Sequence, residues 1–383
     1  MDYRENREEA DFRSRVRAWL QENAPRDWRE ATTTEAQMGQ LMRSWQLKLY
    51  DGGFVGLSWP REYGGHGLSA TYEAILNDEL GRADTPRISF HNYLGRAIFT
   101  YGTEAQKQRF LPPMLRGDVQ WCQGFSEPGA GSDLAALRTH AELRGDHYVV
   151  NGQKMWTSGA QHADWCVLLV RTDREAAKHR GITCLLTSAK TPGITIRPIR
   201  ISDGQPETCE MFFDDVKVPV DQQIGESGAG WRIAMTVLAF ERGPADVGLI
   251  ATYQTALRRL EALAAERGLL RDRETRKAIA RADGLGEALR LNVVEQLSQR
   301  NAGKPPGPDG SVARLLLTQA EQAIRQLELE LCGADAITGA DEEAFASYLR
   351  SRTISIFGGT SEIQKNILAN QVLGMPRPGA APQ

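Results

Sequence analysis

The sequence predicts an α+β multidomain fold in which an N-terminal helical domain, a middle β-sandwich or barrel domain and a C-terminal helical bundle follow one another. Three regions with different patterns along the 383 residues indicate this order. Up to about Asp118 apolar residues recur at helical spacing, from Gln120 to Gly228 short β-rich runs alternate with polar segments, and after Trp231 the helical spacing returns. We therefore expect three domains, over residues 1–119, 120–228 and 229–383.

Helices are expected throughout the first region. Two segments carry apolar side chains about one helical turn apart, namely Phe12, Val16, Trp19 and Leu20, and then Met38, Leu41, Met42 and Trp45. A further helix is expected from Thr71 to Arg82. Thr103 and Gln106 form a capping-box pattern, in which the threonine hydroxyl accepts a first-turn N–H and the glutamine bonds back. Another helix is therefore expected to begin after Thr103.

The middle region contains five β-rich runs: Tyr148–Val150, Trp165–Arg171, Ile182–Thr187, Ile194–Ile199 and Glu210–Phe213. Short strands at this spacing favour a sandwich or barrel over alternating βαβ units. Within this region Asn151-Gly152 predicts a hairpin turn. After Trp231 the helical spacing extends to Val372, with a proline-containing interruption at 303–310.

Composition and charge exclude several classes of protein. The net charge is −3 without a long block of one sign, which argues against a nucleic-acid partner or an anionic membrane surface. No apolar run reaches the roughly 18 residues of a transmembrane segment, and the acidic N-terminus lacks the apolar core of a signal peptide. The five cysteines include no Cys-x-x-Cys pair, and no His-x-x-x-His occurs, so neither disulfides nor a metal site is predicted. We therefore expect a cytoplasmic protein.

Common cofactor and nucleophile motifs do not occur in the sequence. It contains no Gly-x-Gly-x-x-Gly after a predicted strand, no Gly-x-x-x-x-Gly-Lys-Ser/Thr phosphate loop and no Gly-x-Ser-x-Gly nucleophile elbow. A redox cofactor must therefore be held in another way.

Two segments of the middle region suit a flat ligand. Gln123–Asp133 combines small residues, a proline and two hydroxyls, which let the backbone approach a ligand and offer donors to it. Its alternative interpretation is a tight loop entering the β domain. In Asn151–Gly159, hydroxyl side chains follow directly after Trp156, which suits a planar heteroaromatic ring. The alternative there is a core tryptophan at the sheet edge.

Two segments of the C-terminal region suit an anion and a proton transfer. In Phe357–Gln364, two glycines precede a Ser-x-x-Gln capping box, so a helix begins at Ser361 with free N–H groups that attract phosphate. The alternative is an ordinary capped helix. Glu241 follows Phe240, whose apolar ring predicts a raised glutamate pKa suited to proton abstraction, while Arg242 addresses a different face. The alternative is a surface charge pair.

Taken in this order, the four segments resemble the acyl-CoA dehydrogenase family. The resemblance extends from Trp59–Gly65 to Asn366–Gly374 and is most specific at Phe125–Asp133, Asn151–Ser158 and Gly359–Gln364. The nearest likeness is to bacterial members that degrade branched, aromatic or steroid side-chain thioesters. The family implies a helical domain, a middle β domain and a C-terminal helical bundle, with FAD between them.

The resemblance also assigns site residues. FAD would contact Gln123, Phe125, Ser126, Ser132, Trp156, Thr157, Ser158, Thr360 and Glu362. Ser126 would hydrogen-bond the flavin ring, Trp156 would pack against it, and Ser158 would bond near its N5 edge. Thr360 and Glu362 would lie on the phosphate or adenosine side. The acyl-CoA substrate would contact Ser132, Phe240, Arg242 and Gly358.

One departure from the family concerns the catalytic base. Many relatives carry a glutamate where this chain has Gly358, which cannot abstract a proton. Other relatives place the base directly before an arginine in the helix opening the C-terminal domain, and Glu241-Arg242 matches that placement. The resemblance thus implies that Glu241 removes the α-proton while the β-hydrogen leaves as hydride to flavin N5. Electrons would pass to an electron-transfer flavoprotein.

A second departure concerns oligomerisation. The family's Arg-x-x-Phe-Gly, which reaches a neighbouring subunit's FAD, does not occur around Arg267–Arg276, and Gly-Gly-Asn-Gly does not occur around Leu331–Thr338. We expect a homo- or hetero-oligomer, dimer or tetramer. Two alternatives to the dehydrogenase therefore stay open: an FAD-binding or half-site subunit of a hetero-oligomer, and a flavin oxidase or monooxygenase on the same fold.

Overall fold

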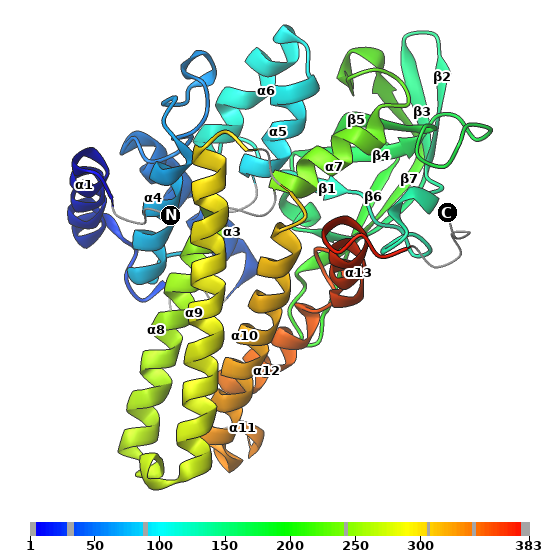
Figure 1. Cartoon of the computed structure of the whole chain (residues 1–383). Helices are drawn as coiled ribbons and strands as arrows, with labels where there is room; N and C mark the ends of the chain where they lie inside the picture. The colour runs from blue at the N-terminus through cyan, green and yellow to red at the C-terminus, as the bar shows by residue number, and fades with distance from the viewer. Residues whose placement is uncertain are drawn as a thin grey trace. The chain divides into compact units, whose positions relative to one another are not determined.

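The computed structural model describes residues 5–28, 34–86, 91–240, 244–304, 307–338 and 342–376, with helices, strands and helices in that order (Figure 1). Two compact units are built from segments that are distant in sequence. We call Met1–Arg26, Ser69–Arg87 and Arg242–Gln383 the helical unit, and Asp27–Leu68 with Ile88–Glu241 the sheet unit. The division at residues 119 and 228 remains a prediction.

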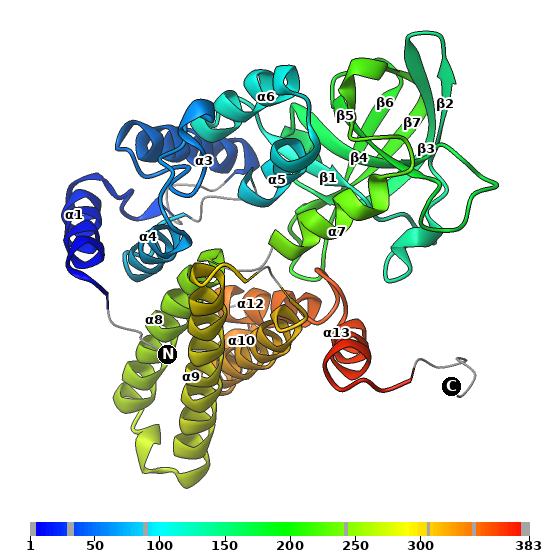
Figure 2. The same ribbon diagram turned by 45° about the horizontal axis from the view of Figure 1, so that its top comes forward.

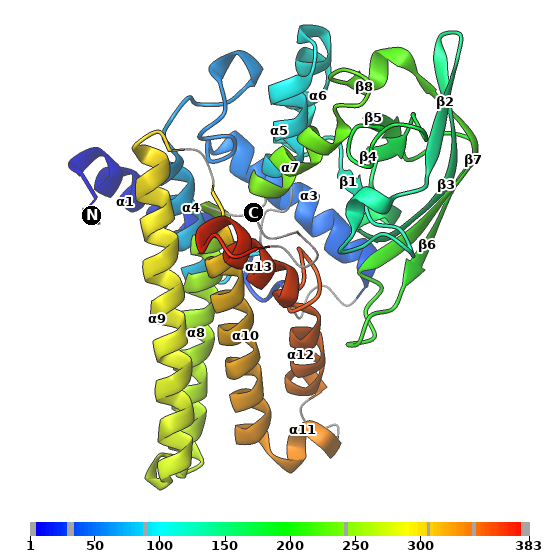
Figure 3. The ribbon, with the colours of Figure 1, turned by 45° about the vertical axis from the view of Figure 1, so that its right-hand side comes forward.

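The helical unit is held together by apolar stripes that face one another. Its helices are α1 (Arg7–Asn23), α4 (Ala70–Arg82), α8 (Pro244–Glu266), α9 (Arg273–Asn301), α10 (Gly310–Cys332), α11 (Ala334–Thr338), α12 (Glu342–Thr353) and α13 (Ser361–Ile367). α8, α9 and α10 lie side by side and share a core that includes Leu257, Leu260 and Ile324 (Figures 1 and 3). α4 packs closely on α8, because Gly81 faces the Gly248 carbonyl.

In its described residues, the sheet unit combines α-helices with a mixed β-sheet. The helices are α3 (Glu35–Asp51), α5 (His91–Tyr101), α6 (Glu104–Arg116) and α7 (Gly230–Phe240). The strands are β1 (Trp121–Gly124), β2 (His140–Arg144), β3 (His147–Ser158), β4 (Trp165–Arg171), β5 (Ile182–Ser188), β6 (Ile194–Ile199), β7 (Thr208–Pro219) and β8 (Gln223–Ile224). Their order is β6-β7-β3-β2-β4-β5-β8, with β1 parallel to β4. Figure 2 shows the sheet, with β1 to β7 labelled.

The predicted fold class is confirmed, and several element bounds are as expected. Strands β4 and β6 have the predicted ends, and α4 begins one residue earlier than predicted. The capping box at Thr103 is present, since its hydroxyl accepts from Gln106 N–H and the Gln106 side chain accepts from Thr103 N–H. Among the described residues, no helix has both the length and the apolar character needed to cross a membrane.

The predicted hairpin turn at Asn151-Gly152 is wrong. Both residues lie inside β3, where the register with β7 shifts between Val150 and Gly152. The Asn151 side chain donates to Asp215 Oδ1 at 2.9 Å and accepts from the Asp215 N–H at 2.9 Å. Gly152 adopts a φ of 145°, which a bulge can require and glycine permits. The sequence signal thus marks a bulge rather than a turn, and β3 continues to Ser158.

Candidate functional site

The loop that follows β1 is fixed to β3 by its backbone. Gln123 is half-buried in β1, Phe125 is buried, and Ser126 is half-buried with its carbonyl accepting the Met155 N–H at 2.9 Å. Glu127 and Ala130 then exchange two backbone hydrogen bonds, which close a tight turn. The first predicted segment is therefore a tight loop, and it lies directly against the segment that carries Trp156.

Trp156 occupies a strained position at the second irregularity of β3. The register with β7 shifts between Lys154 and Thr157, and Trp156 adopts a φ of 63°. A bulky side chain rarely takes this left-handed conformation, and such strain collects at functional sites. The indole is 52% exposed, so the alternative of a core tryptophan is wrong. This side chain is available to a ligand.

Two hydroxyls follow Trp156 on opposite sides of the strand. Thr157 is buried, and its hydroxyl has no hydrogen-bond partner in the described part of the chain. Ser158 is exposed and pairs with Thr208 of β7. With Ser126, the bulge therefore brings an exposed ring and hydroxyl groups to adjoining segments. This donor set suits a planar, heteroatom-rich ring system.

A buried ion pair lies beneath this loop and bulge, and sequence reasoning missed it. Lys154 Nζ lies 2.8 Å from Glu127 Oε1. Burial lowers the pKa of Lys154, although the charge of Glu127 opposes this effect. Burial also opposes ionisation of Glu127, but Lys154 and backbone donors outweigh it, so the pKa of Glu127 is lowered. Glu127 lies within Gln123–Asp133 and Lys154 within Asn151–Gly159, but their contact depends on how the bulge turns β3.

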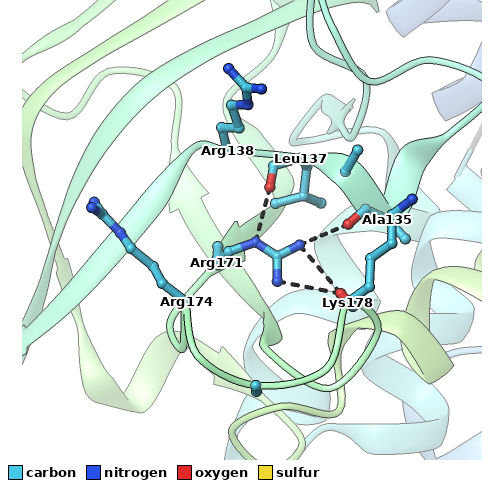
Figure 4. A pocket seen from close by; sticks show the side chains of 8 residues that line it. Ala135, Leu137, Arg138, Arg171, Arg174 and Lys178 are labelled. Carbon is cyan, nitrogen blue, oxygen red and sulfur yellow. Dashed lines mark hydrogen bonds between the residues drawn. The ribbon is translucent and has the colours of Figure 1, made fainter.

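A basic pocket lies between the 3₁₀ turn Leu134–Ala136 and the loop that joins β4 to β5 (Figure 4). Its volume is about 470 Å³, and its lining includes Arg138, Arg171, Arg174 and Lys178. The Arg171 guanidinium donates to the carbonyls of Ala135 and Leu137 and to that of Lys178, which fixes the pocket wall (Figure 4). Arg138 and Arg174 extend outward from the wall (Figure 4).

Ser132 lies near this pocket, because the next residue in the chain contacts the pocket lining. Ser132 itself is exposed, and the next residue, Asp133, forms an ion pair with Lys178 of the pocket lining. The pocket was not predicted, because Arg138 and Arg171–Lys178 are distant in sequence. A run of basic residues in the β4–β5 loop, at Arg174, Lys178 and Arg180, was the available signal. The site suits an anion of the size of a phosphate ester.

In the helical unit, the predicted glycine turn precedes α13 as expected, but its cap differs. The N-cap is Thr360, whose hydroxyl accepts from Ile363 N–H, rather than Ser361. Gln364 does not close a capping box. Its buried amide instead donates to the carbonyls of Gly358 and Gly359, at 3.2 and 3.1 Å. The prediction therefore placed the start of the helix correctly and assigned its cap one residue too late.

The turn itself depends on left-handed glycines. Gly358 and Gly359 have φ values of 65° and 88°, which side chains other than glycine rarely adopt. Arg314 of α10 supports the turn by donating to the Phe357 carbonyl at 2.6 Å. A glutamate at position 358 would be strained in this left-handed conformation. The backbone thus gives a structural reason for the glycine at a position where many relatives carry glutamate. Glu362 is exposed in the first turn of α13.

The proposed base lies outside the described residues, as does its neighbour Arg242. Phe240, the last residue of α7, is half-buried, and the Arg96 guanidinium lies 4.7 Å from its ring centroid. A cation over the ring makes the surroundings of Phe240 less apolar than the sequence argument assumed. The role of Glu241 stays a prediction.

The chain matches three models of acyl-CoA dehydrogenase domains. The N-terminal domain matches residues 6–118, the middle domain residues 122–216 and the C-terminal domain residues 228–373. Together these matches cover most of the chain, and they follow the order of helices, strands and helices described above.

Individual relatives agree with this assignment. Acyl-CoA dehydrogenase IpdE1 of Mycobacterium tuberculosis is 37% identical over 378 residues, covering 96% of this chain and 98% of its own. The human mitochondrial short-chain specific acyl-CoA dehydrogenase is 32% identical, covering 86% of this chain and 82% of its own.

Two solved structures, each described as a pair of proteins, are similar over nearly all of both chains. The ChsE4-ChsE5 complex from Mycobacterium tuberculosis has a TM-score of 0.85 at 32% identity, covering 99% of this chain and 100% of that one. The Tcur3481-Tcur3483 steroid ACAD has a TM-score of 0.84 at 30% identity, also covering 99% of this chain and 100% of that one. Family models, relatives and structures therefore agree that the chain belongs to the acyl-CoA dehydrogenase family, whose members are oxidoreductases.

Proposed function

We propose that this chain is an FAD-dependent enzyme that introduces a double bond between the α and β carbons of an acyl-CoA thioester. Its family and fold support acyl-CoA dehydrogenation. The observation that carries the finer proposal is Trp156, an exposed and strained side chain at a bulge that is bonded through Met155 to the Ser126 loop.

The residues present fit the cofactor on which the family depends. A flavin ring needs an apolar contact for its face and hydrogen-bonding groups along its edge. In the proposal, Trp156 supplies the contact, and the hydroxyls of Ser126, Thr157 and Ser158 supply the hydrogen bonds. Thr157 has a buried hydroxyl without a partner in the described segments, which agrees with a role toward a bound group.

Other assignments follow the resemblance. Gln123 in β1 and the buried Phe125 would support the Ser126 loop. In the helical unit, Thr360 and Glu362 would contact the phosphate or adenosine side of FAD. Bound FAD would supply the hydride acceptor, and an electron-transfer flavoprotein would receive the electrons.

For the substrate, we propose that the basic pocket takes the phosphate groups of CoA. The pocket lies close to Ser132 in the chain and presents Arg138 and Arg174, whose guanidinium groups pair well with phosphate oxygens. One similar structure is described as a steroid ACAD, and we extend that description to a bulky acyl group here. Phe240 and Arg242 would lie toward the acyl thioester.

In the proposed mechanism, Glu241 removes the α-proton of the thioester. The negative charge that develops on the thioester oxygen needs oriented N–H donors, and we assign the backbone of Gly358 to this role. The left-handed turn at Gly358 leaves no side chain there, so the base must come from another residue. We assign this role to Glu241, which stands directly before Arg242 as the base does in the second group of relatives.

Replacing Glu241 by Gln tests the proposal. The amide keeps the shape of the side chain but cannot accept the proton, so the flavin should bleach about 10²- to 10⁴-fold more slowly with acyl-CoA. The anaerobic absorption spectrum gives both the bleaching rate and the intactness of the bound flavin. Glu226→Gln, an exposed glutamate in the same unit, should bleach like the wild type. Unchanged bleaching in Glu241→Gln would exclude Glu241 as the base.

A second candidate is a half-site subunit of a hetero-oligomer. Arg267 lies where the family's inter-subunit motif is missing, and its guanidinium donates to the carbonyls of Leu331 and Cys332 and pairs with Asp335. The two segments that differ from the family's motifs, Arg267–Arg276 and Leu331–Thr338, are therefore bonded to each other within this chain. Both solved relatives above are also described as pairs of different proteins.

A further inference from the structure

The sheet unit contains a buried ion pair that the proposed catalytic and binding roles do not use. The side chains of Lys154 and Glu127 are 0% and 8% exposed, and their charged atoms lie 2.8 Å apart. Burying two charges is costly, and a well-packed apolar pair in the same place often stabilises a protein equally well or better. Stability alone therefore does not explain the pair, and the backbone groups that it holds in place are the relevant feature.

The pair holds the residues on both sides of Ser126 through hydrogen bonds. Lys154 Nζ donates to the carbonyl of Phe125, the residue before Ser126, at 3.0 Å. Glu127, the residue after Ser126, accepts from two successive backbone N–H groups just before β2, at 2.6 and 2.9 Å. One of those N–H groups belongs to Arg138 of the basic pocket. Both carboxylate oxygens are therefore bonded, and three segments meet at the pair.

The hydrogen bonds around the pair also hold the segment that carries Trp156. Met155, directly after Lys154, donates its N–H to the Ser126 carbonyl at 2.9 Å. Trp156 follows with a φ of 63°, and such strain persists only where the surrounding structure fixes the backbone. Lys154 fixes the chain before Trp156, and buried Thr157 fixes it afterwards.

We propose that Glu127 and Lys154 form a positioning pair, which holds the Ser126 loop and the Trp156 bulge in the arrangement that receives the flavin. This inference rests on the proposed function, in which Ser126 and Trp156 contact FAD. A site that is arranged before binding loses less freedom when the ligand enters. Removing the pair should therefore weaken FAD binding more than it weakens the fold.

The test replaces both partners together, because a single substitution would leave an unpaired buried charge. The full-length Glu127→Met, Lys154→Met variant is compared with the wild type in melting temperature, in FAD dissociation constant and in amide hydrogen exchange without FAD. We expect a folded protein with a lower melting temperature, because the Phe125 carbonyl and the Arg138 and Thr139 N–H groups lose their side-chain partners. We also expect faster exchange at Met155. FAD binding should weaken about 10- to 100-fold, by analogy with the loss found when groups that orient metal-ligating side chains are removed.

The control is Lys190→Met, which removes the 2.7 Å ion pair between exposed Lys190 and half-buried Asp164 in the same unit. It should change neither FAD binding nor exchange at Met155. A folded double variant that binds FAD as tightly as the wild type would overturn the positioning role and leave the proposed function intact. A double variant that does not fold would overturn it as well, since the pair would then be needed for the fold itself. Wild-type protein that takes up no FAD would instead refute the proposed function.

Discussion

At the scale of single residues, Trp156 is where the backbone departs furthest from its ordinary preferences. Among the described residues, the other non-glycine positions with positive φ are aspartates, namely Asp27, Asp84 and Asp215. Aspartate tolerates this conformation because its short side chain bonds locally, whereas an indole gains nothing comparable. The strain at Trp156 is therefore the kind that a site imposes.

A pair of substitutions at this position measures that strain. Trp156→Gly and Trp156→Ala both remove the indole, but glycine has no penalty at positive φ. We expect the glycine variant to be more stable than the alanine variant by about 1–2 kcal/mol in urea denaturation without ligands. At Met155, which is not among the positive-φ residues, the order should reverse by about 0.5–1 kcal/mol. The same order at both positions would show that no strain is stored at Trp156.

At the scale of elements, the helical unit depends on one close approach of two helices. A Cβ placed on Gly81 of α4 would lie 2.5 Å from the Gly248 carbonyl oxygen and 2.8 Å from the Ala251 Cβ. Gly248 of α8 faces the Asn77 carbonyl in the same way, at 2.8 Å. Two helices that approach this closely leave no room for a methyl group, so these glycines are required by packing rather than by backbone conformation.

Gly81→Ala should therefore destabilise the protein, by about 1–3 kcal/mol, because the helices must move apart. Gly284→Ala in α9 is the matched control, since a Cβ there meets nothing within 4 Å. It should stabilise the protein by about 0.5–1 kcal/mol, the usual gain of alanine over glycine within a helix. Urea denaturation monitored by circular dichroism measures both. Equal effects of the two substitutions would show that α4 and α8 do not meet as described.

The elements also show where sequence reasoning reaches its limit. The ends of β4 were predictable, because a continuous apolar run buried on both faces has clear boundaries. Strand β2 was missed, because three of its five residues are exposed and its side chains do not alternate between buried and exposed. The bulges of β3 depend on partners in β7, such as Asp215, that no local pattern reveals. The Glu127–Lys154 pair and the basic pocket arise in the same way, from residues joined by tertiary structure.

At the scale of the whole molecule, the residues assigned to FAD are divided between the two units. Ser126 and Trp156 belong to the sheet unit, whereas Thr360 and Glu362 belong to the helical unit. Each unit is itself assembled from separate stretches of the chain, so neither can be isolated by a single cut. Our proposal assigns FAD contacts to both units, so the cofactor content of the purified protein reports on whether this chain suffices.

If the chain is a complete dehydrogenase, the protein purified alone should hold a full equivalent of FAD, which acyl-CoA then bleaches. The flavin absorbance per protein, before and after reconstitution with excess FAD, measures this. The Arg267 contacts are the observation behind the second candidate, because they join within this chain the two segments that the family resemblance would assign to a neighbouring subunit's cofactor. FAD content that stays below one equivalent after reconstitution, and rises only when a second related subunit is co-expressed, would identify the chain as half of a shared site.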